Sequence, residues 1–111
     1  MTKAQLLLKE NKKYLMSFGK VITIATDLWL IPEPRSHLYP DGLKFGWIAF
    51  NEDDPMERVL LDYNPKKGFH YHLNDQPIVK LEWVSLKVAQ QLFKQMVKEK
   101  FGEIVQEIEK R

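Results

Sequence analysis

Two histidines at alternate positions are the residues of this sequence best suited to chemistry. His70 and His72 follow the basic pair Lys66 and Lys67. Side chains of an extended segment alternate between two faces, so both imidazoles would stand together on one face, with the apolar residues around them on the other. Imidazole titrates near neutral pH, so neighbouring histidines can supply the base and the acid for cleaving one phosphodiester, while the lysines hold phosphate. This fits metal-independent RNA cleavage, which needs a base for the 2′-hydroxyl, an acid for the 5′-oxygen and a cation for the developing charge.

The same His-x-His spacing has two other interpretations. Alternate histidines of a strand can bind one metal ion, but the third ligand would have to come from His37, Asp62 or Asp75, none of which lies at a recognised spacing. Histidines in a surface or structural role also fit the pattern. Catalysis, metal binding and a structural role therefore stay open, although we expect no metal and no cofactor.

Two charged residues of the preceding predicted strand are further candidates. Asp62 could orient one imidazole as its carboxylate partner. It could equally pair with Arg58, which lies on the same face of that strand. Arg58 is a candidate phosphate contact, with a surface ion pair as the alternative.

Runs of β-branched and aromatic residues predict the strands that would position these side chains. Strands are expected at residues 20–31, 45–51, 58–63, 69–73 and 78–84. The second is preceded by the turn sequence 39–42, Tyr-Pro-Asp-Gly. Asp53 and Asp54 lie at the polar tip between the second and third strands, where we interpret them as a solvated turn rather than a metal site. The first 18 residues fit a hairpin of residues 5–8 and 13–16 or a short helix, and we favour strands.

From Ser85 onward the apolar residues repeat at intervals of three and four as far as Ile108. This predicts a long amphipathic helix with Ser85 as its N-cap. Gly102 would bend or interrupt it at a cost of about 1 kcal/mol. Strands followed by a helix, with hairpin-length connections, predict an α+β fold, a single-domain antiparallel β-sheet covered on one face by a long C-terminal α-helix.

Length and composition exclude several classes of protein. A chain of 111 residues corresponds to one domain, here residues 1–111. With 44% hydrophobic and 29% charged residues it is neither a disordered tail nor a collagen-like rod, and we expect no membrane association. The absence of cysteine excludes thiol nucleophiles, thiolate zinc sites and disulfides. A net charge of +2 does not by itself indicate nucleic acid. The N-terminus lacks the hydrophobic region of a secretory signal, so we expect a cytoplasmic protein.

Four short segments of the sequence occur in a recognisable order. They are residues 38–45 (LYPDGLKF), 62–64 (DYN), 68–72 (GFHYH) and 81–85 (LEWVS). This order resembles the TumE-like toxin family of prokaryotic toxin–antitoxin systems, over about residues 20–98. The resemblance implies a small toxin with a ribonuclease-like action, neutralised by an antitoxin that is often a helix-turn-helix protein. By matching position, His70 and His72 correspond to the family's His-x-His, Gly68 to the glycine before it and Lys44 to the lysine after the glycine turn. Residues 62–64 depart from the family pattern, in which tyrosine usually precedes aspartate.

We therefore expect a toxin that acts on RNA, with His70 and His72 as acid and base and Asp62 as their carboxylate partner. The expected phosphate contacts are Lys44, Arg58, Lys66 and Lys67. A non-catalytic protein–protein interaction module and a metal-dependent nuclease or transferase are the alternatives. A homodimer, or an antitoxin segment that adds as a strand to an exposed edge, is compatible with the predicted sheet.

Overall fold

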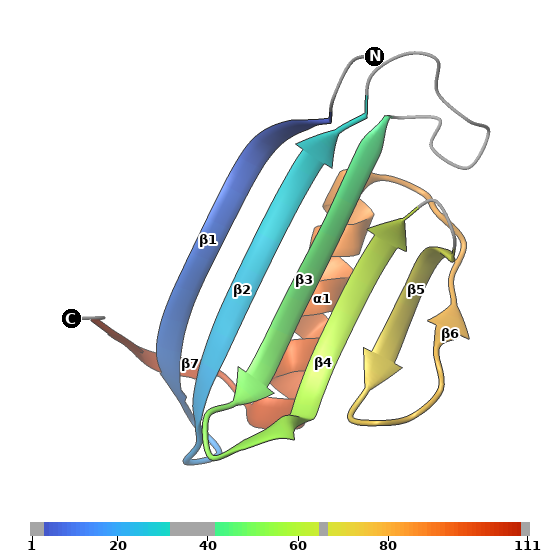
Figure 1. Cartoon of the computed structure of the whole chain (residues 1–111). Helices are drawn as coiled ribbons and strands as arrows, with labels where there is room; N and C mark the ends of the chain where they lie inside the picture. The colour runs from blue at the N-terminus through green and yellow to red at the C-terminus, as the bar shows by residue number, and fades with distance from the viewer. Residues whose placement is uncertain (1–3, 32–41, 65–66, 110–111) are drawn as a thin grey trace.

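A seven-stranded antiparallel sheet with the order β6-β5-β4-β3-β2-β1-β7 forms the framework of the protein (Figure 1). The computed structural model describes residues 4–31, 42–64 and 67–109. The elements are β1 (Gln5–Met16), β2 (Val21–Leu30), β3 (Leu43–Asn51), β4 (Asp54–Asn64), β5 (Gly68–Leu73), β6 (Val79–Lys80), α1 (Leu86–Phe101) and β7 (Ile104–Ile108). From β1 to β6 each strand pairs with the next along the chain, and β7 returns to pair with β1. The predicted α+β fold, an antiparallel sheet with a C-terminal helix on one face, is confirmed.

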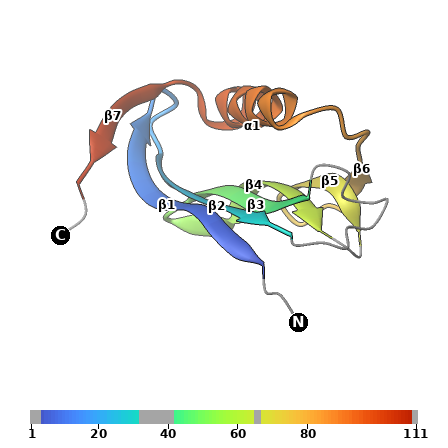
Figure 2. The ribbon, with the colours of Figure 1, turned by 90° about the horizontal axis from the view of Figure 1, so that it is seen from above.

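The helix α1 packs on one face of the sheet and closes the core (Figure 2). Its buried residues, Ala89, Phe93, Val97 and Phe101, repeat at intervals of four and so form one stripe. Core residues alternate along β3, β4 and β5, and Met16 of β1 and Ile22 of β2 join them. Those on β3, β4 and β5 are Phe45, Trp47, Ala49, Val59, Leu61, Tyr63 and Phe69. Their aromatic rings are in direct contact, as in the stacked pair Phe45 and Trp47, whose centroids are 4.0 Å apart.

Alternate residues of the same strands point to the opposite face of the sheet, here called the outer face. On β3, β4 and β5 the outer face carries Lys44, Gly46, Ile48, Phe50, Arg58, Leu60, Asp62, His70 and His72. The register joins them in rows across the sheet, because Gly46 is opposite Asp62 and Asp62 is opposite His70. Any site that uses the histidines therefore belongs to the face opposite α1.

The helix is shorter than the apolar pattern predicts. It begins after Ser85, whose side chain accepts a hydrogen bond from Val88 N–H as the sequence suggested, and it ends at Phe101. Gly102 takes a φ of 86°, a left-handed conformation that favours glycine, and its N–H donates to the carbonyl of Lys98. The apolar residues beyond Gly102 form β7 instead, so the expectation of one continuous helix to Ile108 was wrong.

The N-terminal region is one long strand rather than the predicted short hairpin. β1 pairs with β2 from Gln5 opposite Leu30 to Leu15 opposite Val21, with an irregularity between Leu6 and Leu8. The turn lies at residues 17–20, where Gly19 has a φ of 90°. The polar residues 10–12, which suggested a turn, are exposed in mid-strand.

The last strand before the helix is shorter than predicted. The last predicted strand, residues 78–84, is reduced to Val79–Lys80, and the chain beyond it runs towards α1 with Leu81 and Trp83 packed against the core. The turn predicted at residues 39–42 falls outside the described residues except for Gly42. In the described part of the chain no helix has the length and apolar character needed to cross a bilayer.

Candidate functional site

His70 and His72 lie side by side on the outer face of β5, as their spacing predicts. His70 is opposite Asp62 on β4 and His72 is opposite Leu60, whereas Tyr71 is opposite the core residue Leu61. The centroids of the two imidazole rings are 5.4 Å apart, and their planes meet at 73°. The pair therefore forms one local arrangement rather than two separate surface residues.

The two histidines differ in exposure and in contacts. His70 is only 1% exposed, with Nδ1 3.2 Å from the carbonyl oxygen of Gly68 and Nε2 3.8 Å from Oδ2 of Asp62. Because a carbonyl oxygen only accepts hydrogen bonds, the Gly68 contact requires the proton on Nδ1. His72 is half-buried. The sequence predicts both imidazoles as acid and base, but in this arrangement only His72 has surface that a large substrate can touch.

Asp62 belongs to a row of polar residues that crosses the outer face. Asp27 of β2 is opposite Gly46, which is opposite Asp62, and on the other side His70 is opposite Lys80 of β6. Gly46 N–H donates to Oδ1 of Asp27 over 2.8 Å. A Cβ at position 46 would stand 3.7 Å from Oδ1 of Asp27 and 3.8 Å from Oδ1 of Asp62, so the glycine leaves space between two carboxylates.

Asp27 and Lys80 were not among the predicted site residues. Each sits at an alternate position of its strand, so the face it occupies follows from the strand pattern. Its neighbours, however, depend on the pairing register, which no short motif in the sequence specifies.

Two of the predicted phosphate contacts, Lys44 and Arg58, lie on the outer face. Lys44 is exposed on β3, opposite Trp29 of β2. Lys67 is exposed just before β5, and Lys66 lies outside the described residues. Arg58 shares the outer face with Asp62, but its Nε donates to the carbonyl oxygen of Asn74 over 3.2 Å. Arg58 therefore joins β4 to the turn after β5.

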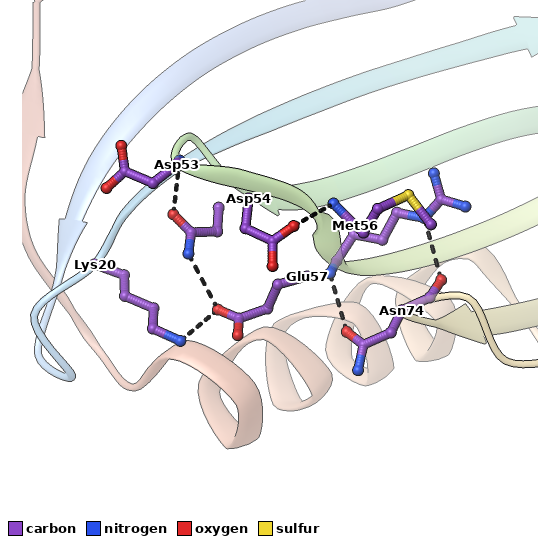
Figure 3. A network of polar contacts seen from close by, with 8 residues as sticks. Lys20, Asp53, Asp54, Met56, Glu57 and Asn74 are labelled. Atoms are coloured by element: carbon purple, nitrogen blue, oxygen red, sulfur yellow. Dashed lines mark hydrogen bonds and ion pairs between the residues drawn. The ribbon is translucent and has the colours of Figure 1, made fainter.

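The carboxylates at the β3–β4 tip have a structural role (Figure 3). Asp53 and Asp54 are exposed, and Oδ1 of Asp54 accepts a hydrogen bond from Met56 N–H. This agrees with the interpretation as a solvated turn. Beside them Glu57 accepts a 2.5 Å hydrogen bond from Lys20 Nζ, and this bond, with the attraction of the Lys20 charge, lowers the pKa of Glu57 from its ordinary value despite partial burial.

Two further observations bear on what the site can hold. Within residues 4–31, 42–64 and 67–109 no three His, Asp, Glu or Cys side chains come together in a way that could bind a metal ion. His37, one of the ligands considered from the sequence, lies outside these residues. A cavity of about 410 Å³ lies between β5 and α1, on the face opposite the histidines. It is lined by Tyr71, Leu73, Leu92, Met96, Glu99 and Lys100.

Comparison with family models, with curated proteins and with solved structures gave no match in any of the three. The resemblance to the TumE-like family therefore stays a prediction from the order of the motifs. The chemistry available at the site follows from its own geometry, which joins a half-exposed imidazole to a buried imidazole and a carboxylate, with lysines on the same face.

Proposed function

We propose that the protein is a cytoplasmic toxin that acts on RNA and that His72 is the residue in contact with the reacting phosphodiester. The observation that carries this proposal is the pairing of half-buried His72 with buried His70, 5.4 Å apart, on the sheet face opposite α1. His70 is held by the Gly68 carbonyl and faces the Asp62 carboxylate. Buried contacts of this kind fix the orientation of the His70 ring, and the more exposed ring of His72 can pack against it.

The proposed reaction is attack by the 2′-hydroxyl of RNA on the adjacent phosphorus. His72 takes the hydroxyl proton while the 2′-oxygen bonds to phosphorus. The bond from phosphorus to the 5′-oxygen breaks, and the 5′-oxygen takes a proton from solvent. The products are a 2′,3′-cyclic phosphate and a 5′-hydroxyl. His70 and Asp62 are positioning residues in this scheme, because neither ring nitrogen of His70 is turned towards solvent.

The outer face also carries groups suited to holding a single strand. Lys80 is exposed directly opposite His70, and Lys44 is exposed on β3. Their charges can meet phosphate and the negative charge that develops in the reaction. Trp29 and Phe50 are half-buried on the same face, where an aromatic ring can stack on a base. The proposal thus places RNA across β3, β4 and β5.

Growth of a bacterial host that expresses the chain tests the proposal. Wild-type protein is expected to arrest growth, co-expression of the product of the adjacent gene to restore it as the antitoxin, and His72→Ala to abolish the arrest. Lys94→Ala, at an exposed position of α1 on the other side of the molecule, is the matched control and should stay toxic. Circular dichroism of each purified variant shows that it is folded.

Purified protein and a single-stranded RNA then distinguish the mechanisms. Cleavage in chelator that leaves 2′,3′-cyclic phosphate ends supports the proposal, and His70→Ala should lower kcat and change its pH profile with little change in KM. Activity that chelator removes and one divalent ion restores would instead indicate the metal-dependent nuclease. Intact RNA together with 1:1 binding to the neighbouring gene product would indicate a protein–protein interaction module.

A further inference from the structure

Arg58 lies diagonally across from His72 on the outer face of the sheet. His72 on β5 is opposite Leu60 on β4, and Arg58 precedes Leu60 by two residues, so its side chain points to the same face. Diagonal neighbours on one face of an antiparallel pair are about 7–8 Å apart, a separation that long side chains bridge. Arg58 therefore belongs to the immediate surroundings of the imidazole that is proposed to react.

Arg58 is held in place by the turn that follows β5. Its Nε donates to the carbonyl oxygen of Asn74 over 3.2 Å, and its backbone N–H donates to Oδ1 of the same residue, also over 3.2 Å. The backbone N–H of Asn74 donates in return to the carbonyl oxygen of Arg58 over 2.9 Å. Three hydrogen bonds therefore tie Arg58 to the end of β5, two residues beyond His72.

The terminal nitrogens of Arg58 remain available to a ligand. A guanidinium has five N–H donors, and the contact with Asn74 uses the one on Nε. Among the described residues no carboxylate forms an ion pair with Arg58. Asp62, the partner considered from the sequence, faces His70 instead. A half-buried arginine that is held at Nε presents its two terminal nitrogens as a planar fork, which matches two oxygens of a phosphate.

We infer that Arg58 holds the reacting phosphodiester beside His72 and stabilises the negative charge that develops on its two non-bridging oxygens. This role rests on the proposed function and adds to it a group that acts on the phosphate itself. The guanidinium stays protonated and transfers no proton, so the bonds that form and break are those already given. Two N–H groups of the fork donate to the non-bridging oxygens, and donors that are fixed before the reaction stabilise developing charge most effectively.

Lys80 provides the matched comparison for Arg58. It is opposite His70 on β6 and is therefore the diagonal neighbour of His72 on the other side of β5. Lys80 is exposed, however, and among the described residues its ammonium group makes no hydrogen bond or ion pair. Its charge can attract RNA, but the side chain is not fixed before the reaction. We therefore expect Arg58 to act mainly on kcat and Lys80 mainly on KM.

Steady-state cleavage of a single-stranded RNA by the full chain tests the inference. Arg58→Ala should lower kcat by about 100-fold with a smaller change in KM, because the transition state loses preorganised donors. Arg58→Lys keeps the charge but not the fork, so its kcat should lie between those of wild type and Arg58→Ala. Lys80→Ala should chiefly raise KM. Circular dichroism of each purified variant shows that it is folded.

Added guanidinium chloride distinguishes a direct role of the Arg58 side chain from the loss of its bond to Asn74. At concentrations below the unfolding range it should raise the kcat of Arg58→Ala, whereas an equal concentration of sodium chloride should not. A wild-type kcat in Arg58→Ala, a kcat that guanidinium leaves unchanged, or a larger loss of kcat in Lys80→Ala would overturn the inference and leave the proposed function standing. RNA left intact by the wild-type chain would overturn both.

Discussion

Asp62 and His70 face each other across the β4–β5 ladder, with Oδ2 of Asp62 3.8 Å from Nε2 of His70. The imidazole is buried and the carboxylate half-buried. The other ring nitrogen of His70 contacts the carbonyl of Gly68 at the start of β5. His70 therefore holds the beginning of β5 against β4, in addition to any role behind His72.

The first prediction concerns the stability that each histidine contributes. His70→Ala should lower the free energy of unfolding by about 2–3 kcal/mol, because it empties a buried site and removes the partner of the Gly68 carbonyl. His72→Ala should cost less than about 1 kcal/mol, because that ring is half-exposed. Urea denaturation followed by tryptophan fluorescence measures both. Equal losses would show that His70 is not the structural member of the pair.

The second prediction concerns Gly102, which ends α1. A Cβ there would overlap Oγ of Ser17 and stand 2.9 Å from Cδ1 of Phe18. Gly102→Ala should therefore destabilise the protein by about 3 kcal/mol, since strain at positive φ adds to the overlap.

Gly68 is the control for Gly102, because it has a φ of 69° but open space where a Cβ would stand. Gly68→Ala should cost only about 1 kcal/mol, the conformational part alone. Urea denaturation of the two variants measures this difference. A Gly102 variant no less stable than the Gly68 variant would show that the contact with the 17–20 turn adjusts without cost.

The third prediction concerns pH. The Lys20 hydrogen bond lowers the folded-state pKa of Glu57 from its ordinary value of 4.5. A carboxylate with a lowered pKa contributes stability above its unfolded pKa and loses it as pH falls through the folded pKa. Wild-type protein should therefore lose more stability than Glu57→Gln on acidification from about pH 6 to about pH 3, by less than about 1 kcal/mol because the pair is partly exposed.

Thermal unfolding at several pH values measures this effect. Glu82→Gln, which changes an exposed carboxylate before α1, is the control and should follow the wild-type curve. If Glu57→Gln and wild type lose stability in parallel, the Lys20 contact does not form in solution.

The fourth prediction concerns the start of α1. Ser85 Oγ accepts a 3.2 Å hydrogen bond from Val88 N–H. Ser85→Ala should cost about 1 kcal/mol, because it leaves that N–H without its cap. Gln90→Ala, at an exposed position within the same helix, should not destabilise the protein, since alanine has the higher helix propensity. Chemical denaturation distinguishes a loss at the cap from a general effect of truncating a polar side chain.

Local patterns in the sequence predict much of this fold. The alternation around His70 and His72 predicts their shared face, and Ser85 and Gly102 mark the two ends of the helix. Local patterns fail where the structure of a segment depends on pairing with a strand that is distant in the sequence. The apolar spacing at Ile104 and Ile108 suits a helix as well as a strand, and pairing with β1 decides for the strand.

In the candidate site, too, local sequence predicts some properties and distant strand pairing decides the others. The face of each side chain follows from its position in a strand. The burial of His70, in contrast, depends on the packing around β5. Asp27 of β2 and Asp62 of β4 come near each other because Gly46, on the strand between them, has no side chain. The pairing register of the strands decides which side chains are neighbours, and the pairing of the whole sheet fixes that register.

The shortness of β6 has a consequence for the histidines. Among the described residues β6 pairs with β5 at His70 and Tyr71, and Leu81 N–H, just after β6, donates to the carbonyl of Phe69. The strand that bears both imidazoles is therefore separated from the edge of the sheet by one short strand. Fraying of that short strand breaks few bonds and leaves β1 to β4 intact. Amide protons of β5 should consequently exchange with solvent faster than those of β3, and each such opening brings His70 nearer to water while the rest of the molecule keeps its shape.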